Sequence, residues 1–153
     1  MSRSAVVAAL LPLLALGGCD PGTTHPNAEK EIIALERSAL DKWSQGTPMG
    51  YVDIGAPDVT WFDFTPGEQQ RIDGLEAVRV YLEPFEGQIP LHTYSIENPK
   101  VQVYGNAAIL TFHYSGTMTD GTPMPKWKAT SVYFWKDGEW RMVHAHWSLV
   151  QSE

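Results

Sequence analysis

The chain has 153 residues, of which 18 are acidic and 11 are basic, and its formal net charge is −7 at pH 7. This length is that of one domain. An acidic surface repels nucleic-acid phosphates and anionic lipid headgroups, so the composition disfavours a nucleic-acid-binding protein and predicts no basic patch that could hold the chain to a membrane.

The first 18 residues have the pattern of a secretory signal sequence. Arg3 precedes an apolar run from Ala5 to Leu16, which is shorter than the roughly 20 residues of a membrane-spanning helix. The run ends in Leu16-Gly17-Gly18-Cys19, which resembles the lipobox of bacterial lipoproteins. The resemblance implies cleavage at residue 18 and lipidation of Cys19, and hence a membrane-anchored lipoprotein of the bacterial cell envelope that faces the periplasm.

Cys19 is the chain's only cysteine, so a lipidated protein keeps no thiol for a disulfide, a zinc site or nucleophilic catalysis. Residues 19–27 contain two prolines and are mostly polar, as expected of a lipidated tether. Residues 28–153 are then the folded domain.

Three helices are predicted in the first half of the domain. Asn27 is a plausible N-cap for the first, which ends at Gly46 and has an apolar stripe of Ile32, Ile33, Leu35, Ala39, Leu40 and Trp43. A short second helix starts at Thr47-Pro48 and ends near Gly55. The third starts after Asp73, which has the spacing of a capping residue, and ends at Pro84.

Strands dominate the rest of the domain. Residues 59–64 (VTWFDF) are rich in β-branched and aromatic residues and predict one strand among the helices. After Gln88, alternating segments are predicted as strands over residues 91–97, 100–104, 107–118, 124–135 and 140–150, and Asp137-Gly138 predicts a two-residue hairpin. The fold class is therefore α+β, an antiparallel sheet with helices on one face.

The ordered segments TPMGY, VTWFDF, RIDGLEAVR, LHTYSIENPKVQVYGNAAIL and WKDGEWRMVHAHWS resemble the nuclear transport factor 2-like superfamily over Glu29 to Ser148. The nearest branches are the SnoaL-like proteins and the association domain of calcium/calmodulin-dependent kinase II. The resemblance implies a cone-shaped, cystatin-like fold in which three N-terminal helices wrap a curved sheet, with an apolar pocket and dimerisation through the sheet. Because this superfamily contains isomerases, dehydratases, cyclases, binding modules and oligomerisation modules, the fold does not decide the function.

Two histidines stand two residues apart in the last strand, in MVHAHWS. If Trp140 and Met142 face the helices, then His144, His146 and Ser148 share that inner face, while Val143, Ala145 and Trp147 face outward. Three roles remain open for the histidine pair: metal binding, general acid–base catalysis, and the polar lining of a pocket or a dimer contact. Metal binding would need further ligands from His92, His113, Asp63 or Glu97, and no paired ligand motif supports it.

Asp63 and His146 are the catalytic candidates. Asp63 lies among aromatic residues, where burial would raise its pKa and suit it to proton transfer. The alternative is that Asp63 caps a turn or pairs with Arg71. No metal and no cofactor is predicted.

The ligand-binding candidates are the aromatic and histidine residues expected to surround the pocket: Trp61, Tyr81, His92, Tyr114, Trp127, His144 and His146. His92 enters through the resemblance, because it matches a pocket histidine of the association domain, whose pocket also uses arginines to bind small carboxylates. Ser131 stands where the association domain has one of these arginines. Lys126 and Lys128 could supply the missing positive charge if they do not lie on a solvated hairpin edge. Trp147 is predicted to face outward at a dimer interface.

The sequence thus predicts a membrane-anchored pocket domain that forms a homodimer and binds a small apolar or aromatic organic molecule. The alternatives are an acid–base enzyme (an isomerase, dehydratase or cyclase) that uses Asp63 or a pocket histidine, and an oligomerisation module.

Overall fold

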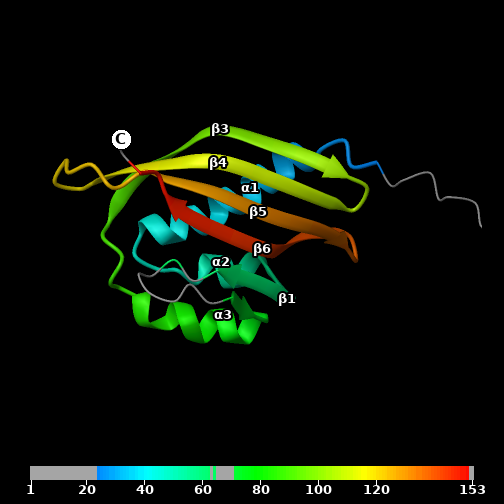
Figure 1. Cartoon of the computed structure of the whole chain (residues 1–153), viewed down its shortest axis with the longest axis horizontal. Coiled ribbons are helices and arrows are strands. Elements are labelled where there is room, and N and C mark those ends of the chain that lie inside the picture. Colours follow the sequence, from blue (N-terminus) through cyan, green and yellow to red (C-terminus); the bar gives the residue numbers. More distant parts are fainter. Residues whose placement is uncertain (1–23, 63, 65–70, 152–153) are drawn as a thin grey trace, which may run out of the picture.

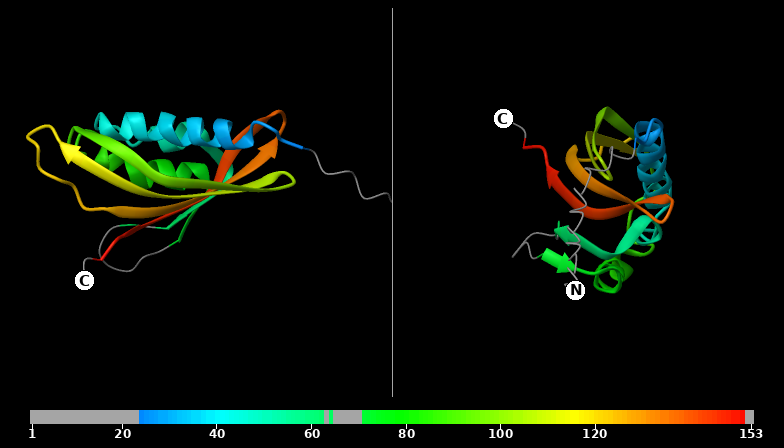
Figure 2. Two further views of the ribbon diagram at one scale, coloured as in Figure 1. Left: turned by 90° about the horizontal axis from the view of Figure 1, so that it is seen from above. Right: turned by 90° about the vertical axis from the view of Figure 1, so that its right-hand side faces the viewer.

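The computed structural model describes residues 24–62, 64 and 71–151. The helical elements are α1 (Ala28–Ser44), α2 (Gly50–Ile54), α3 (Leu75–Leu82) and the short 3-10 helix η1 (Glu83–Phe85). The strands are β1 (Gly55–Phe62), β2 (Arg71–Asp73), β3 (His92–Tyr104), β4 (Ala107–Met118), β5 (Trp127–Lys136) and β6 (Glu139–Leu149). They form one curved sheet in the order β2-β1-β6-β5-β4-β3, and the helices lie on one of its faces (Figures 1 and 2).

This architecture confirms the predicted α+β fold, although several elements differ: β1 is Gly55–Phe62 instead of 59–64, β5 is Trp127–Lys136 instead of 124–135, and β2 was not predicted. β1 pairs with β6 in parallel, so the sheet is not antiparallel throughout. Asp73 lies in β2 rather than capping α3, whose N-cap is Gly74 with a φ of 92°. The segments 91–97 and 100–104 form one strand, β3, interrupted by an irregularity between Glu97 and Lys100. No helix within the described part of the chain is long and apolar enough to span a membrane.

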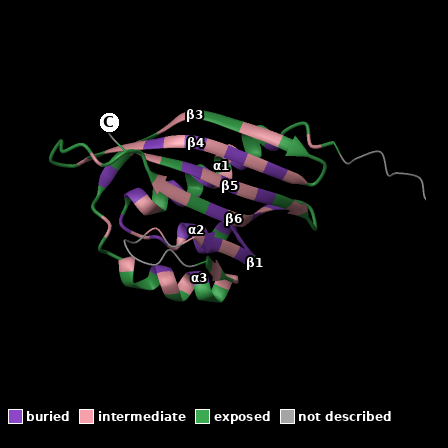
Figure 3. Cartoon of the chain, viewed as in Figure 1, coloured by how far each residue is buried: buried purple, intermediate pink, exposed green. Residues whose placement is uncertain are grey.

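The core lies between α1 and the sheet. Every second residue of β4, from Ala108 to Tyr114, is buried against the helices, and the alternation is visible along the strands in Figure 3. α1 contributes Ile32, Ala39 and Leu40, each at most 1% exposed. The apolar face of α1 therefore packs on the apolar face of the sheet, as the helical period of α1 and the alternation of the strands predict.

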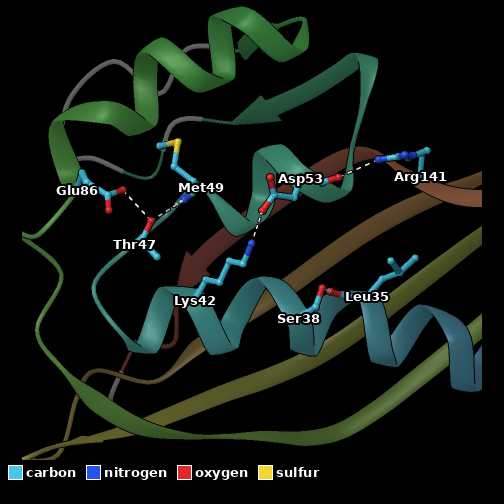
Figure 4. A network of polar contacts seen from close by, with 8 residues as sticks. All are labelled: Leu35, Ser38, Lys42, Thr47, Met49, Asp53, Glu86 and Arg141. Carbon is cyan, nitrogen blue, oxygen red and sulfur yellow. Dashed lines mark hydrogen bonds and ion pairs between the residues drawn. The ribbon is translucent and has the colours of Figure 1, made fainter.

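Polar contacts fix α2 and the chain segments beside it (Figure 4). Lys42 of α1 pairs with the Asp53 carboxylate at 2.5 Å, and the Arg141 guanidinium of β6 donates to the Asp53 carbonyl at 2.8 Å. Thr47 donates its hydroxyl to Glu86 at 2.7 Å, which ties the α1–α2 turn to the segment after η1. These bonds hold α1, α2, β6 and the segment after η1 together.

A β-bulge in β6 reverses the predicted orientation of the C-terminal strand. Tyr133 of β5 pairs with Met142, whereas Val132 pairs with His144, so Val143 is an extra residue without a partner. One inserted residue moves every later side chain to the opposite face. Met142 is buried against the helices as predicted, but the next buried residue is Ala145. The prediction that His144, His146 and Ser148 face the helices is therefore wrong.

Candidate functional site

An apolar pocket of about 260 Å³ lies between the helices and the sheet. Eight aromatic residues of the described chain line it: Trp43, Tyr51, Trp61, Phe64, Phe85, Tyr114, Trp127 and Trp147. Leu40, Ile89 and Met124 add aliphatic surface, and Gln88 adds an amide. The walls come from α1, α2, η1, four strands and the loop that precedes β3, so distant parts of the sequence meet here.

Trp61, Tyr114 and Trp127, three of the predicted ligand-binding residues, line this pocket. Each occupies an inward position on its own strand, β1, β4 or β5, so the alternation of a half-buried strand identifies them. Trp147 lines the same pocket, because the bulge at Val143 turns it inward. The prediction of an outward-facing Trp147 at a dimer interface is wrong for this reason.

Tyr81 and His92 lie behind the pocket wall. Tyr81 packs edge-on against Phe64, with ring centroids 5.8 Å apart, and its hydroxyl oxygen accepts a bond from the Phe64 N–H at 3.4 Å. His92 is 4% exposed and hydrogen-bonded to the Tyr114 hydroxyl. Both residues therefore support side chains that line the pocket.

The hydrogen bonds of His92 define its tautomer. Its Nδ1 lies 2.6 Å from the Pro90 carbonyl oxygen, which can only accept, so Nδ1 carries a hydrogen. In the neutral ring, Nε2 then accepts the Tyr114 hydroxyl proton. Burial, followed by the electrostatic effect of the neighbouring Tyr94 phenol, raises the pKa of Tyr114 and keeps its hydroxyl protonated. A ligand that meets the Tyr114 hydroxyl would find a hydrogen-bond acceptor.

Glu36 forms a buried polar network next to the pocket. It is fully buried on α1, and its two carboxyl oxygens accept bonds from the hydroxyls of Tyr51 at 2.9 Å and Tyr133 at 2.5 Å. Burial raises the pKa of Glu36 and also raises the pKa of both tyrosines. Tyr51 joins the two features, because its ring lines the pocket while its hydroxyl holds Glu36.

Sequence reasoning missed Glu36, although a signal was present. It lies four residues after Ile32 and four before Leu40, within the apolar stripe of the first helix. A carboxyl group at that spacing must be buried with hydrogen-bonding partners. Tyr51, Tyr133 and Ser131 could not be assigned as its neighbours because they come from other elements.

His144 and His146 lie on the opposite, helix-free face of the sheet. The His144 Nδ1 lies 2.8 Å from the Thr60 hydroxyl, and Phe62 of β1 packs edge-on against both imidazole rings. Burial, followed by the charge of His146, lowers the pKa of His144. The pair is therefore not brought together with Trp61, Tyr114 and Trp127, which line the pocket.

Lys126 and Lys128 also lie away from the pocket. Lys126 is hydrogen-bonded to Glu97, and Lys128 lies beside His113 and Ser148 in the adjacent strands. Asp63 and Cys19 lie outside the described residues, so the catalytic role predicted for Asp63 and the lipidation predicted for Cys19 remain predictions. Within the described chain, no group of three His, Cys, Asp or Glu residues is placed to hold a metal ion.

Residues 28–151 match the family model for the calcium/calmodulin-dependent protein kinase II association domain. The chain belongs to this family. A related association domain occurs in the delta subunit of this kinase from Oryctolagus cuniculus, which is 29% identical over 124 residues. The match covers 77% of this chain but only 23% of the kinase subunit, so the chain spans less than a quarter of that relative.

Solved structures resemble this association domain over most of its length. A ketosteroid isomerase candidate from Parabacteroides distasonis is 32% identical, with a TM-score of 0.68 over 82% of this chain and 90% of that chain. The CaMKII hub homology domain of Chlamydomonas reinhardtii is 25% identical, with a TM-score of 0.65 over 81% of this chain and 99% of that chain. Further neighbours have NTF2-like and cystatin-like folds, which confirms the predicted fold.

Proposed function

We propose that this association domain binds a small apolar or aromatic organic molecule in its aromatic pocket. The supporting observation is that eight aromatic side chains surround about 260 Å³ of space instead of filling it. An apolar cavity of about 150 Å³ accepts benzene, whereas pockets for drug-sized ligands start at about 300 Å³. A molecule of one or two rings therefore suits the available volume.

The test is the binding of 6-propionyl-2-dimethylaminonaphthalene (prodan), a neutral two-ring probe whose fluorescence rises in apolar surroundings. Ile89→Trp would fill the pocket that Ile89 lines, whereas Leu91→Trp adds the same ring to an exposed position outside it. We expect saturable binding by the wild type and by Leu91→Trp, and loss of binding in Ile89→Trp. Equal binding by both variants, or no binding by the wild type, would refute the proposal.

An acid–base reaction in this pocket has less support. The ketosteroid isomerase candidate is a relative by sequence, but the described residues that line the pocket include no carboxylate, ammonium or imidazole group. Such a reaction would depend on Asp63 or on His92 acting through Tyr114, since His146 faces away.

A second function, homo-oligomerisation, is favoured by the uncovered face of the sheet and by the hub domains among the structural neighbours. At the end of this face near the β3–β4 and β5–β6 hairpins, apolar side chains are aligned across adjacent strands: Tyr104, Ala107, Ile109, Val132 and Phe134. Tyr104 is 61% exposed and Phe134 is 41% exposed. A second copy that packs on this patch would bury it.

Native mass spectrometry would measure this assembly. We expect a dimer or larger oligomer that dissociates in Phe134→Glu, because a carboxylate would be desolvated in the contact. Val80→Glu is the matched control, since Val80 is exposed on α3, away from the sheet. A monomeric wild type, or an oligomer that Phe134→Glu leaves intact, would rule out this contact.

Anchoring of the domain to a bacterial envelope membrane through a lipid on Cys19 completes the proposal. It is supported by the apolar run, the lipobox-like Leu16-Gly17-Gly18-Cys19 and the lone cysteine. Metabolic labelling with a palmitate analogue in a bacterial host should label the wild type and not Cys19→Ser. Unlabelled wild type that is released in soluble form would contradict the anchor.

A further inference from the structure

Two irregularities of the sheet bring polar side chains to one end of its helix-free face. The bulge at Val143 turns His146 and Ser148 onto this face. In β3, Asn98 and Pro99 together oppose the single residue Phe112, and Asn98 has a left-handed backbone with a φ of 50°, which asparagine tolerates better than most residues. β-Bulges often re-aim a side chain beside a functional site, and Asn98 of the second bulge lines the same groove as His146 and Ser148.

The groove has a volume of about 410 Å³. Two rows of polar side chains cross its floor on β4, β5 and β6: Thr111, Thr130 and His146 in one row, and His113, Lys128 and Ser148 in the next. Adjacent strands are about 4.8 Å apart, and residues two apart along a strand are separated by about 6.7 Å. Hydroxyl, imidazole and ammonium donors therefore lie close enough together to contact one small molecule.

The charge of the groove is opposite to that of the chain, whose net charge is −7. The described residues that line it include a lysine and two histidines but no carboxylate. The acidic side chain of Glu97 lies beside His113, but its two oxygens accept bonds from Ser115 and Lys126. Lys128 has no ion-pair partner among the described residues.

We propose that this groove binds a small phosphate monoester. Lys128 supplies the fixed positive charge, while Thr111, Thr130 and Ser148 supply hydroxyl donors for the phosphate oxygens. A phosphate group carries several strong acceptor oxygens, which matches the many donors, and the groove leaves room for a small organic group attached to it. This site is separate from the aromatic pocket, on the other face of the sheet, and does not depend on the ligand proposed there.

The test is a titration of the ¹⁵N-labelled protein with glycerol 3-phosphate, followed by NMR at constant ionic strength, with glycerol and sodium chloride as comparison titrants. Saturable shifts confined to β4, β5 and β6 near Lys128 would support the site. We expect Lys128→Met to weaken binding about tenfold or more, because it removes a charge-assisted hydrogen bond. Lys136→Met, on the same strand outside the groove, should bind like the wild type.

Three results would overturn the proposal: no saturable shifts, shifts located away from the groove, or equal weakening by both lysine variants. Dispersed amide spectra of each variant would show that the fold is intact. A second variant, Thr130→Val, removes a donor without changing charge, and it should also weaken binding. If Thr130→Val binds like the wild type while both lysine variants bind weakly, only general charge attraction is at work.

Discussion

Replacement of Glu36 by leucine tests the buried network most sharply. Glu36→Leu keeps the approximate volume but leaves the hydroxyls of Tyr51 and Tyr133 without their acceptor, in a place where both tyrosines are at most 1% exposed. An orphaned buried hydroxyl costs about 1–3 kcal/mol, so we expect the free energy of unfolding to fall by about 2–6 kcal/mol. This is a large part of the roughly 5–15 kcal/mol that stabilises a typical domain.

The same reasoning predicts recovery when the tyrosine hydroxyls are removed as well. In the triple variant Glu36→Leu, Tyr51→Phe, Tyr133→Phe, neither position 51 nor position 133 keeps a hydroxyl that needs an acceptor, and apolar replacement of buried hydrogen-bonded partners together is often nearly neutral. Urea denaturation followed by tryptophan fluorescence would measure all variants, with Glu29→Leu on the exposed face of α1 as the control. A single variant as stable as the wild type, or a triple variant no more stable than the single one, would refute the reasoning.

Three further predictions concern packing and pH. Gly50→Ala should lower the free energy of unfolding by about 1–3 kcal/mol through overpacking, because an added Cβ would lie 2.7 Å from the Ala39 Cα; an unchanged urea midpoint would contradict this. Burial raises the pKa of Glu36 above its ordinary 4.5, so the wild type should lose stability relative to Glu36→Gln as the pH rises above about 4.5. A constant difference in unfolding free energy between the two proteins across this range would contradict that sign. The pKa of His144 is lowered, so the stability that its neutral imidazole contributes is fully present above about pH 6.5 and is lost on acidification. The free energy of unfolding of His144→Gln should therefore fall less steeply on acidification than that of the wild type. Equal slopes of stability against pH for the two proteins would contradict this prediction.

The sequence was sufficient for features that depend on local pattern. The apolar stripe of the first helix, the bounds of β4 and the hairpin at Asp137-Gly138 agree with the structure, where both hairpin residues have positive φ. The first helix ends at Ser44, two residues before the predicted Gly46. Periodicity and turn chemistry determine such elements over a few neighbouring residues.

The orientation of the last strand could not be predicted, because it depends on one unpaired residue. Trp140, Met142, His144 and His146 alternate without interruption, and nothing in that pattern marks Val143 as the bulge. The shift becomes visible only when β6 is paired with β5. Because of this shift, Trp147 and not the two histidines lines the pocket. The pocket is therefore apolar and not polar.

The parallel pairing of β1 with β6 is likewise a long-range feature. It places Trp61 beside Ala145, more than eighty residues away along the chain. As a result, Trp61 of β1 and Trp147 of β6 line the same pocket. Inward alternation identified Trp61 as a pocket residue. The partners that complete the wall from α1, α2 and η1 required the tertiary structure.

The central claim is that the aromatic pocket holds a small organic molecule. Native mass spectrometry of the gently purified protein, without added ligand, tests it most directly when the wild type is compared with Ile89→Trp and Leu91→Trp. The account predicts a bound organic adduct on the wild type and on Leu91→Trp that is absent from Ile89→Trp. Wild-type protein without an adduct that also fails to take up prodan, or an adduct that persists in Ile89→Trp, would contradict it.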